Sequence, residues 1–444
     1  MLATGPATDR LVDSSNGTIS NAIFSHPDIY EQELEQIFSR MWLFVGHESQ
    51  VPKPGDFVRS RMGEEQVILT RGIEGKVHVL LNSCAHRGNM VCRYDQGNSL
   101  AFTCSFHGWV YGSDGALKAL PPGSDELYSA LHKEEWGLLQ ARVETFQGTI
   151  WATWDHSAPG LLEYMGGCDQ YLAAALADAD GTPDGTEVVG GVMRWRVGLN
   201  WKVPMPDNDA THGWITHVSA RGPANVNFGG PPRSGGQSYH VWFPEGHTSS
   251  HRILDEGAPD PSPGLAFGGG TGSDYKVLTD YWQSKYAARK QRLGRLANFD
   301  EPPHFFPNMG SVGRIIRVLH PNGPAETEMW SYILVDKSAP PEVKEAQVRY
   351  HERRWGPNGL IQKDDMENWA VLTQYSKGMM TRRSLRQNAQ LALGKPSLHG
   401  PSEFGLPGMF HPSPTDENIR RFYGRWAEVM DARDWDQMRV TSVK

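Results

Sequence analysis

The sequence predicts an α+β protein in which a small all-β domain is inserted between an N-terminal helix and a larger mixed domain. Residues 27–44 carry helical periodicity, residues 51–154 alternate short β-rich runs with turn residues, and the chain after residue 155 mixes both patterns. At about 150 residues per domain, 444 residues suggest two or three domains. We therefore expect a helical segment over residues 1–45 that packs on the third domain, a β domain over residues 46–155 and a mixed domain over residues 156–444.

The composition excludes several classes of protein. An apolar share of 39%, with 15 tryptophans and 16 phenylalanines, is enough for a buried core and excludes wholesale disorder. Four cysteines are too few for a disulfide framework in a chain of this length. A net charge of -8 without a basic stripe argues against nucleic-acid binding. The N-terminus lacks a signal-peptide pattern and no apolar run approaches the ~20 residues of a membrane span, so we expect a cytoplasmic protein.

The individual elements follow from local patterns. Ile29, Leu34, Ile37 and Met41 recur at three- and four-residue steps after Pro27 and predict the N-terminal helix. Runs such as QVILT, VHVLL and GTIWATW, separated by Gly, Pro and Asn, predict the strands of the β domain. In the third domain, the same patterns predict a strand over 191–199, a long loop over 256–273, a helix over 275–297, paired strands over 312–319 and 329–335, and helices over 341–354, 363–377 and 415–430.

A first group of metal-binding residue types lies in the β domain, where Cys84-x-His86 is followed after 17 residues by Cys104-x-x-His107. Zinc could take all four side chains as one tetrahedron, although its usual half-sites pair Cys with Cys and His with His. A [2Fe–2S] cluster with two Cys on one iron and two His on the other explains why each loop supplies one of each. Four ordinary buried side chains are the remaining interpretation. The joint spacing favours the cluster.

A second group, Asp209, His212 and His217, lies in the third domain. Two His and one carboxylate on one face of an iron leave the other face open for O₂ and substrate. Asp209 and His212 are three residues apart and share a helix face. His217 converges on them only if the helix breaks, for which Gly213 is suitably placed. Taken alone, a group of this kind is more often a helix with two structural histidines than a metal site.

The first group resembles the Rieske motif, including Arg87-Gly88 and Gly108-Trp109 after its two halves. It lacks the extra cysteine that each loop carries in quinol-oxidising Rieske proteins. With the second group, and with Asn200-Trp201-Lys202 leading into it, the chain resembles the α subunit of aromatic-ring-hydroxylating Rieske non-haem iron dioxygenases over most of its length. The resemblance implies a Rieske [2Fe–2S] domain before a catalytic domain whose antiparallel sheet is flanked by helices, in a helix-grip-like fold.

The resemblance also implies roles for particular residues. Its cluster ligands are Cys84, His86, Cys104 and His107, and its mononuclear Fe(II) ligands are His212, His217 and Asp365. Asp365 stands in a segment like the family's late Asp-Asp-x-Glu-Asn-Trp, although two acids at a helix N-terminus are also favoured by the helix dipole. Asp209 matches the carboxylate that carries electrons between neighbouring subunits. Because the sequence departs from the family just before it, Asp207 is the alternative for that bridge.

The implied function is the oxygenase component of a multicomponent system that uses O₂ and NAD(P)H-derived electrons for cis-dihydroxylation of a small aromatic substrate. NAD(P)H would act only through a reductase, with or without a ferredoxin, since the chain has no GxGxxG-type loop. The implied assembly is three α with three small β subunits, or an α trimer. The alternatives are a Rieske monooxygenase or O-/N-demethylase and, from other classes, an iron–sulfur electron carrier or a zinc-stabilised binding protein. An aromatic acid would need a buried Arg, for which Arg314 and Arg317 are candidates.

Overall fold

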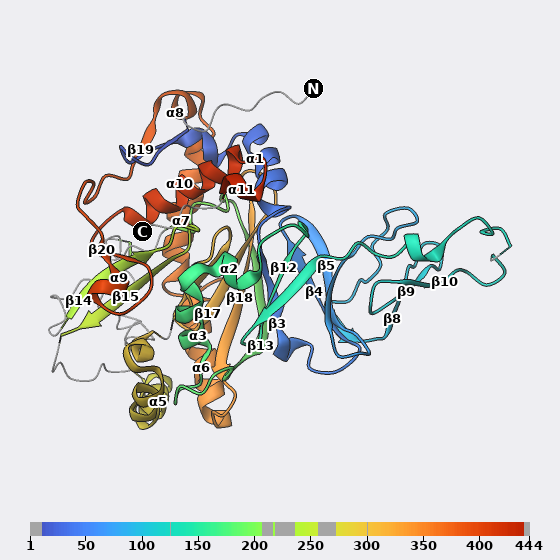
Figure 1. Ribbon diagram of the computed structural model, residues 1–444, viewed down its shortest axis with the longest axis horizontal. Helices are drawn as coiled ribbons and strands as arrows, with labels where there is room; N and C mark the ends of the chain where they lie inside the picture. Colours follow the sequence, from blue (N-terminus) through green and yellow to red (C-terminus); the bar gives the residue numbers. More distant parts are fainter. Residues whose placement is uncertain are drawn as a thin grey trace. The chain divides into compact units, whose positions relative to one another are not determined.

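The computed structural model describes residues 11–124, 126–206, 216–217, 236–255, 272–299 and 301–438. It divides the chain into two compact units (Figure 1). The β unit is Phe38–Leu161, and the α+β unit combines Met1–Ile37 with Leu162–Lys444. The predicted fold class is confirmed, since an all-β unit is inserted in a larger unit of helices and antiparallel sheets. No helix in the described part of the chain is long and apolar enough to cross a membrane.

The β unit holds three antiparallel sheets. Their strand orders are β6-β5-β4-β7 (Val77–Leu81, Glu65–Arg71, Asp56–Met62, Gln96–Asn98), β10-β9-β8 (Leu117–Ala119, Val110–Gly112, Ala101–Thr103) and β11-β12-β3 (Arg142–Phe146, Thr149–Thr153, Leu43–His47). An apolar core lies between the first two sheets and includes Ile68, Leu80 and Phe102. Cys84 and Cys104 belong to the same core, so both halves of the predicted cluster motif are anchored in it.

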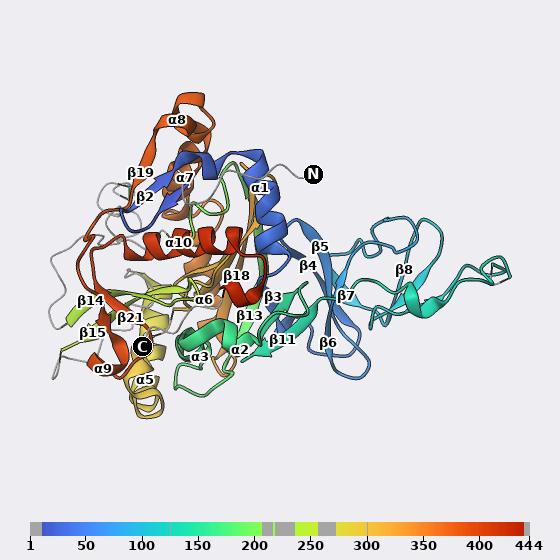
Figure 2. The same ribbon diagram turned by 45° about the horizontal axis from the view of Figure 1, so that its top comes forward.

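The α+β unit also holds three antiparallel sheets. The strand orders are β13-β18-β17-β16 (Thr186–Val197, Thr327–Asp336, Ile315–Pro321, Met309–Val312), β15-β14-β21-β20 (Thr248–Leu254, Gly236–Trp242, Met409–Pro412, Leu398–His399) and β1-β2-β19 (Val12–Asp13, Thr18–Ser20, Arg386–Asn388). The predicted strand pair at 312–319 and 329–335 is confirmed as β17 and β18. The small third sheet joins the N-terminal segment to a late part of the chain (Figure 2).

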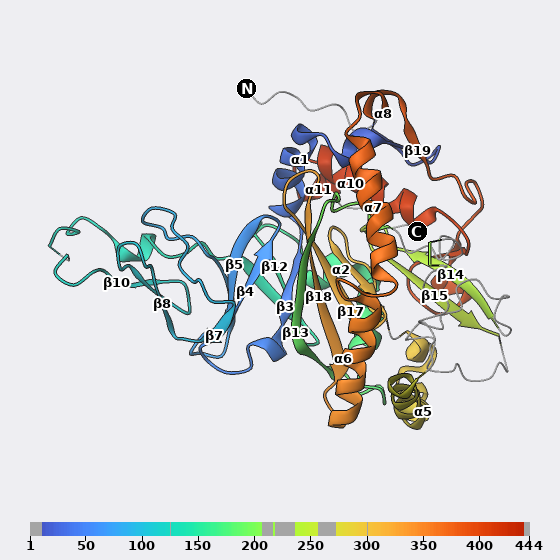
Figure 3. The ribbon, with the colours of Figure 1, turned by 180° about the vertical axis from the view of Figure 1, so that it is seen from behind.

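Helices cover the first of these sheets, which we call the central sheet, on both faces. Figure 3 shows α6 (Pro341–Trp355) and α7 (Gln362–Ser376) across one face, and Figure 1 shows α3 (Asp169–Leu176) on the opposite side. Helix α10 (Glu417–Asp431) packs against β14 and β1 of the other two sheets. The remaining helices are α1 (Pro27–Glu33), α2 (Leu161–Met165), α5 (Ser273–Leu293), α8 (Met379–Ser384), α9 (Gly400–Glu403) and α11 (Trp435–Met438). The helices predicted over 275–297, 341–354, 363–377 and 415–430 are thus confirmed, with small differences at their ends.

The helix predicted over residues 27–44 is shorter than expected. Helix α1 ends at Glu33, a π-helix spans Leu34–Phe38, and Leu43–His47 is strand β3. All five residues of β3 are buried, and the strand pairs with Thr149–Ala152 of β12. Tertiary pairing therefore overrides the helical periodicity at this end of the segment.

A buried ion pair joins α1 to the segment that precedes the predicted iron site. Lys202 Nζ lies 2.6 Å from Glu33 Oε1, and both side chains are fully buried. Glu33 also accepts hydrogen bonds from the indole N–H groups of Trp201 (2.9 Å) and Trp426 (2.8 Å). Burial raises the pKa of Glu33 and lowers the pKa of Lys202, because desolvation disfavours both charges. Three distant parts of the chain thus meet at one carboxylate.

Candidate functional site

The predicted cluster motif forms two loops with the same backbone geometry. In the first loop, the Cys84 N–H donates to Asn89 O at 2.8 Å and the Gly88 N–H donates to Cys84 O at 2.8 Å. The second loop repeats both bonds, from Cys104 at 2.8 Å and from Gly108 at 3.0 Å. Both glycines have a φ of 71°, a left-handed conformation that L side chains rarely adopt. The two loops therefore present their Cys and His residues in equivalent ways.

The two cysteines of the motif are buried. Cys84 is 3% exposed and Cys104 is 1% exposed. Burial alone would raise the pKa of the Cys104 thiol, but hydrogen bonds from the Phe106 backbone and the Asn89 side chain outweigh it and lower that pKa. The Tyr111 hydroxyl lies 3.2 Å from Cys84 Sγ. The lower pKa of Cys104 favours its thiolate, which is the form of cysteine that binds iron.

The two histidines are less buried than the cysteines. The ring centroids of His86 and His107 lie 4.5 Å apart, and His86 stacks on Trp109 at 4.8 Å. Burial, with smaller effects from the charges of His107 and Arg87, lowers the pKa of His86. This shift favours the neutral imidazole, which is the form that binds a metal. His86 Nδ1 is buried without a hydrogen-bond partner among the described residues, which suits an atom that binds a metal.

These four side chains fit a two-iron cluster better than a zinc ion. A tetrahedral zinc would need all four around one point, whereas a Rieske cluster divides them two and two between its irons. The donor set, with one Cys and one His from each of two equivalent loops, therefore matches the cluster.

The second predicted site is described in part. His217 and Asp365 come from distant parts of the α+β unit, and His217 Nε2 lies 3.1 Å from Asp365 Oδ1. His217 is 2% exposed and Asp365 is 8% exposed, so the pair is shielded from water. The neighbouring carboxylate of Asp364 lies 3.6 Å from His217 Nδ1. Three of the predicted residues lie outside the described part of the chain: Asp207, Asp209 and His212.

Helix α7 sets the direction of Asp365 through contacts with the central sheet. The Arg317 guanidinium of β17 donates to Gln362 Oε1 in the first turn of the helix. One turn later, Trp195 Nε1 of β13 donates to Met366 Sδ at 3.0 Å. Because Asp365 lies between these two contacts, its backbone is fixed relative to the sheet.

The two arginines proposed as anchors for an aromatic acid have other partners. Arg314 lies 2.6 Å from Asp336, and both side chains are buried. Burial lowers the pKa of Arg317 to about 10, against the opposing charge of Asp365. The sequence prediction missed the contact between Arg317 and Gln362. Only the three-residue spacing of Gln362 and Asp365 could have indicated that both lie on one face of a helix.

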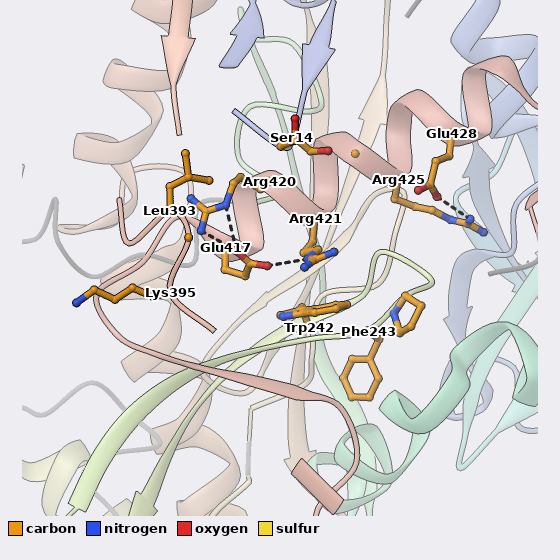
Figure 4. A pocket seen from close by; sticks show the side chains of 14 residues that line it. Ser14, Trp242, Phe243, Leu393, Lys395, Glu417, Arg420, Arg421, Arg425 and Glu428 are labelled. Carbon is orange, nitrogen blue, oxygen red and sulfur yellow. Dashed lines mark hydrogen bonds and ion pairs between the residues drawn. The ribbon is translucent and has the colours of Figure 1, made fainter. Parts of the chain in front are cut away.

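A separate cavity of about 470 Å³ lies between α10, β14 and the N-terminal segment (Figure 4). Arg421 lies over the Trp242 ring at 3.6 Å and is held by Glu417 at 2.7 Å. None of the predicted metal ligands that the structure describes lines this cavity, which is therefore distinct from the site of His217 and Asp365.

The chain matches known proteins along almost its whole length. Residues 41–140 match the family model of the Rieske [2Fe-2S] domain. The sequence is 37% identical to biphenyl 2,3-dioxygenase subunit alpha of Rhodococcus jostii, over 97% of this chain and 93% of the relative. The chain belongs to the Rieske dioxygenase α subunits. This α subunit is also 34% identical to benzene 1,2-dioxygenase subunit alpha of Pseudomonas putida, over 98% of this chain and 95% of the relative.

The fold of the α subunit agrees with these relatives. The crystal structure of naphthalene 1,2-dioxygenase from Rhodococcus sp., bound to indole, superposes with a TM-score of 0.83 at 27% identity and covers 98% of this chain and 100% of that chain. The α subunit is therefore an oxidoreductase with a Rieske [2Fe–2S] cluster and a mononuclear iron. It is the oxygenase component of a multicomponent system, and its reaction is cis-dihydroxylation of an aromatic substrate. The predicted family, cofactors and reaction are confirmed.

Proposed function

We propose that Cys84, His86, Cys104 and His107 are the cluster ligands of this α subunit. The matched backbone of the two loops supports this assignment, since equivalent loops can deliver one Cys and one His each to a two-iron cluster. The buried cysteines take one iron and the more exposed histidines take the other. When bound, the cluster supplies single electrons and the mononuclear iron activates O₂.

His212, His217 and Asp365 are our proposed ligands of the mononuclear iron. The observation that carries this proposal is the 3.1 Å approach of His217 Nε2 to Asp365 Oδ1 in a buried site. The Asp209 carboxylate would accept an N–H from a ligand histidine on each side, which orients both imidazoles across a boundary between subunits.

The substrate class that we propose is an uncharged aromatic hydrocarbon. Two of the relatives described above are named for biphenyl and benzene. An aromatic acid would need a guanidinium group for its carboxylate. Arg314 already pairs with Asp336. Arg317 donates a hydrogen bond to Gln362 and interacts with the charge of Asp365, so the protein itself balances both cations. A hydrocarbon needs no such partner, because burial of its apolar surface drives its binding.

The proposed partners are a ferredoxin, a reductase and a small β subunit, in an assembly of three α and three β chains or an α trimer. A multicomponent arrangement is typical of the family to which the chain belongs. The bridge through Asp209 requires at least two α subunits side by side. Sedimentation of the purified oxygenase, with and without a co-expressed β subunit, measures the stoichiometry.

The reaction is tested by turnover of the reconstituted system with biphenyl and with benzoate under isotopically labelled O₂. We expect a cis-dihydrodiol of biphenyl that carries label in both hydroxyl groups, and no turnover of benzoate. Turnover of benzoate alone would contradict the hydrocarbon assignment. Label in a single oxygen would favour the monooxygenase alternative.

The bridging carboxylate is tested by Asp209→Ala, with Asp207→Ala as the matched control. Asp209→Ala should keep both metals and lose turnover, because the histidines on each side lose their shared hydrogen-bond acceptor. Asp207→Ala should keep both metals and turnover. The reverse result would move the bridge to Asp207. His212→Ala should lose the mononuclear iron while the visible spectrum of the cluster stays; loss of the cluster would indicate misfolding.

A further inference from the structure

Arg317 is a buried cation beside the proposed iron site. It lies on β17, opposite Gly310 of β16 and Ser331 of β18, and is 7% exposed. A buried guanidinium is costly unless its charge is balanced and its N–H groups are hydrogen bonded. The groups that balance the charge of Arg317 therefore indicate which interaction the buried guanidinium supports.

Two residues of α7 interact with Arg317, one through a hydrogen bond and one through its charge. The guanidinium donates to Oε1 of Gln362, whose side chain is completely buried. Among the charges near Arg317, the Asp365 carboxylate acts on it most strongly. Gln362 and Asp365 are three residues apart in one helix and share a face. The same carboxylate lies 3.1 Å from His217 Nε2, so it contacts an imidazole and also acts through its charge on the guanidinium.

We propose that Arg317 and Gln362 are positioning residues that keep the Asp365 carboxylate directed at His217, where a mononuclear iron would bind. This inference rests on the proposed ligation by Asp365. The guanidinium balances part of the negative charge of the carboxylate, and its hydrogen bond to Gln362 holds the first turn of α7 against β17. A carboxylate held in one direction loses less conformational freedom on binding a metal, so metal affinity rises.

Two other roles for Arg317 make different predictions. A purely structural role would lower stability on substitution without changing the surroundings of the iron. A role in binding a substrate carboxylate would change the KM for aromatic acids without changing iron affinity. The properties of the mononuclear iron therefore separate the positioning role from both alternatives.

The experiment uses the full-length α subunit with its co-purifying partner subunits, as wild type and as Arg317→Met, Arg317→Lys and Gln362→Met. Arg354→Met is the matched control, because Arg354 is also buried (6% exposed) but lies over the Tyr350 ring. The mononuclear iron is removed with a chelator and Fe(II) is titrated back. Total iron per acid-labile sulfide should be about 1.5 with both metal centres and about 1 with the cluster alone. The EPR line shape of the Fe(II)–nitric oxide adduct reports ligand geometry.

Arg317→Met should weaken Fe(II) binding about 10- to 100-fold and change the EPR line shape of the nitric oxide adduct, while the EPR signal of the reduced cluster stays. Gln362→Met should show a smaller loss, and Arg317→Lys should recover part of the affinity because it keeps the charge. Arg354→Met should bind Fe(II) like the wild type. If Arg317→Met does not fold, Gln362→Met decides the question. Wild-type affinity and line shape in the folded variants would overturn the inference.

Asp365→Ala separates this inference from the proposed function. If Asp365→Ala keeps its mononuclear iron, the ligand assignment itself is wrong. If Asp365→Ala loses the iron and Arg317→Met keeps it with unchanged affinity, only the positioning role is wrong. If both lose it and Arg354→Met does not, the ligand and its positioning residues are both supported.

Discussion

The two candidate metal sites are built in opposite ways. In the β unit, the four proposed cluster ligands lie between residues 84 and 107 and sit on two loops with the same local hydrogen bonds. In the α+β unit, His217 and Asp365 come from distant segments and meet only because α7 packs on the central sheet. The first site depends on turns, and the second depends on packing.

This difference indicates which substitutions should disturb each site. A loop closed by its own backbone keeps its shape as long as the strands beside it form. A site assembled from distant segments depends on every contact that fixes those segments, including the buried pair Glu33–Lys202. We therefore expect changes of ligands in the β unit to have local effects. Changes of buried polar residues in the α+β unit should act at a distance.

Cys84→Ser should have the largest effect. It also tests whether the two metal sites are independent of each other. The variant should lose nearly all of its cluster, because a serine oxygen is a poor replacement for a thiolate on iron. The mononuclear iron of the α+β unit should remain. Visible absorption and the EPR signal of the reduced cluster measure the first result, and iron and sulfide analysis measures the second.

Cys92→Ser is the matched control for that variant. Cys92 is also buried, but its Sγ faces Tyr94 O at 3.6 Å and burial raises the pKa of its thiol. It should therefore keep the cluster. Loss of the cluster in both variants would indicate that the β unit is destabilised by any polar change in its core.

The same difference explains how much the sequence could predict. Cys84, His86, Cys104 and His107 could be assigned from spacing, because the loops that carry them are local. Helix α7 and the strand pair β17–β18 were predicted from periodicity and turn residues. Asp365 needed a resemblance to a known segment, since acids in a first helical turn are common for other reasons.

The missed features are those in which distant residues meet. The sequence predicted a helix through residue 44, but pairing of β3 with β12 ends it earlier. Glu33 looks like an ordinary polar residue of an amphipathic helix, yet it is fully buried among Lys202 and two indoles. Arg317 could not be told from a surface residue of a strand until Gln362 was seen beside it. No local pattern encodes such contacts.

The next largest effect should follow Glu33→Gln, which tests the dependence of the α+β unit on distant contacts. The variant leaves the Lys202 ammonium group buried without a counter-charge, which should cost about 3–5 kcal/mol of the free energy of unfolding. The double variant Glu33→Gln/Lys202→Met should recover part of that loss, because no uncompensated charge remains. Urea unfolding followed by far-UV circular dichroism measures both. A free energy of unfolding of Glu33→Gln within about 0.5 kcal/mol of the wild-type value would show that the ion pair is dispensable.

A smaller effect should appear as a pH dependence of the α+β unit. Burial lowers the pKa of His351 from 6.5 to about 4. Below pH 6.5 the unfolded chain binds a proton that the folded chain rejects until about pH 4. The contribution of His351 to the free energy of unfolding is thus fully present above pH 6.5. It is lost as the pH falls toward 4, and the loss reaches about 3 kcal/mol. His351→Asn keeps a donor for the Gln347 carbonyl and should flatten the dependence measured by urea unfolding between pH 7.5 and pH 5. An unchanged slope would mean that other groups control it.

The smallest effect should come from Arg421, which tests whether exposed contacts of the α+β unit matter as buried ones do. Its side chain is 45% exposed, although it lies over Trp242 at 3.6 Å and contacts Glu417 at 2.7 Å (Figure 4). Because solvent screens these contacts, Arg421→Ala should lower the free energy of unfolding by only about 0.5–1 kcal/mol.

Arg420, one position earlier, is 5% exposed and donates to Ala389 O at 2.6 Å. Arg420→Ala should therefore cost about 2–3 kcal/mol, since it leaves buried acceptors unpaired. Equal losses in the two variants would show that burial does not decide the strength of these contacts. The expected sensitivity of the α+β unit to changes of buried polar residues would then need another cause.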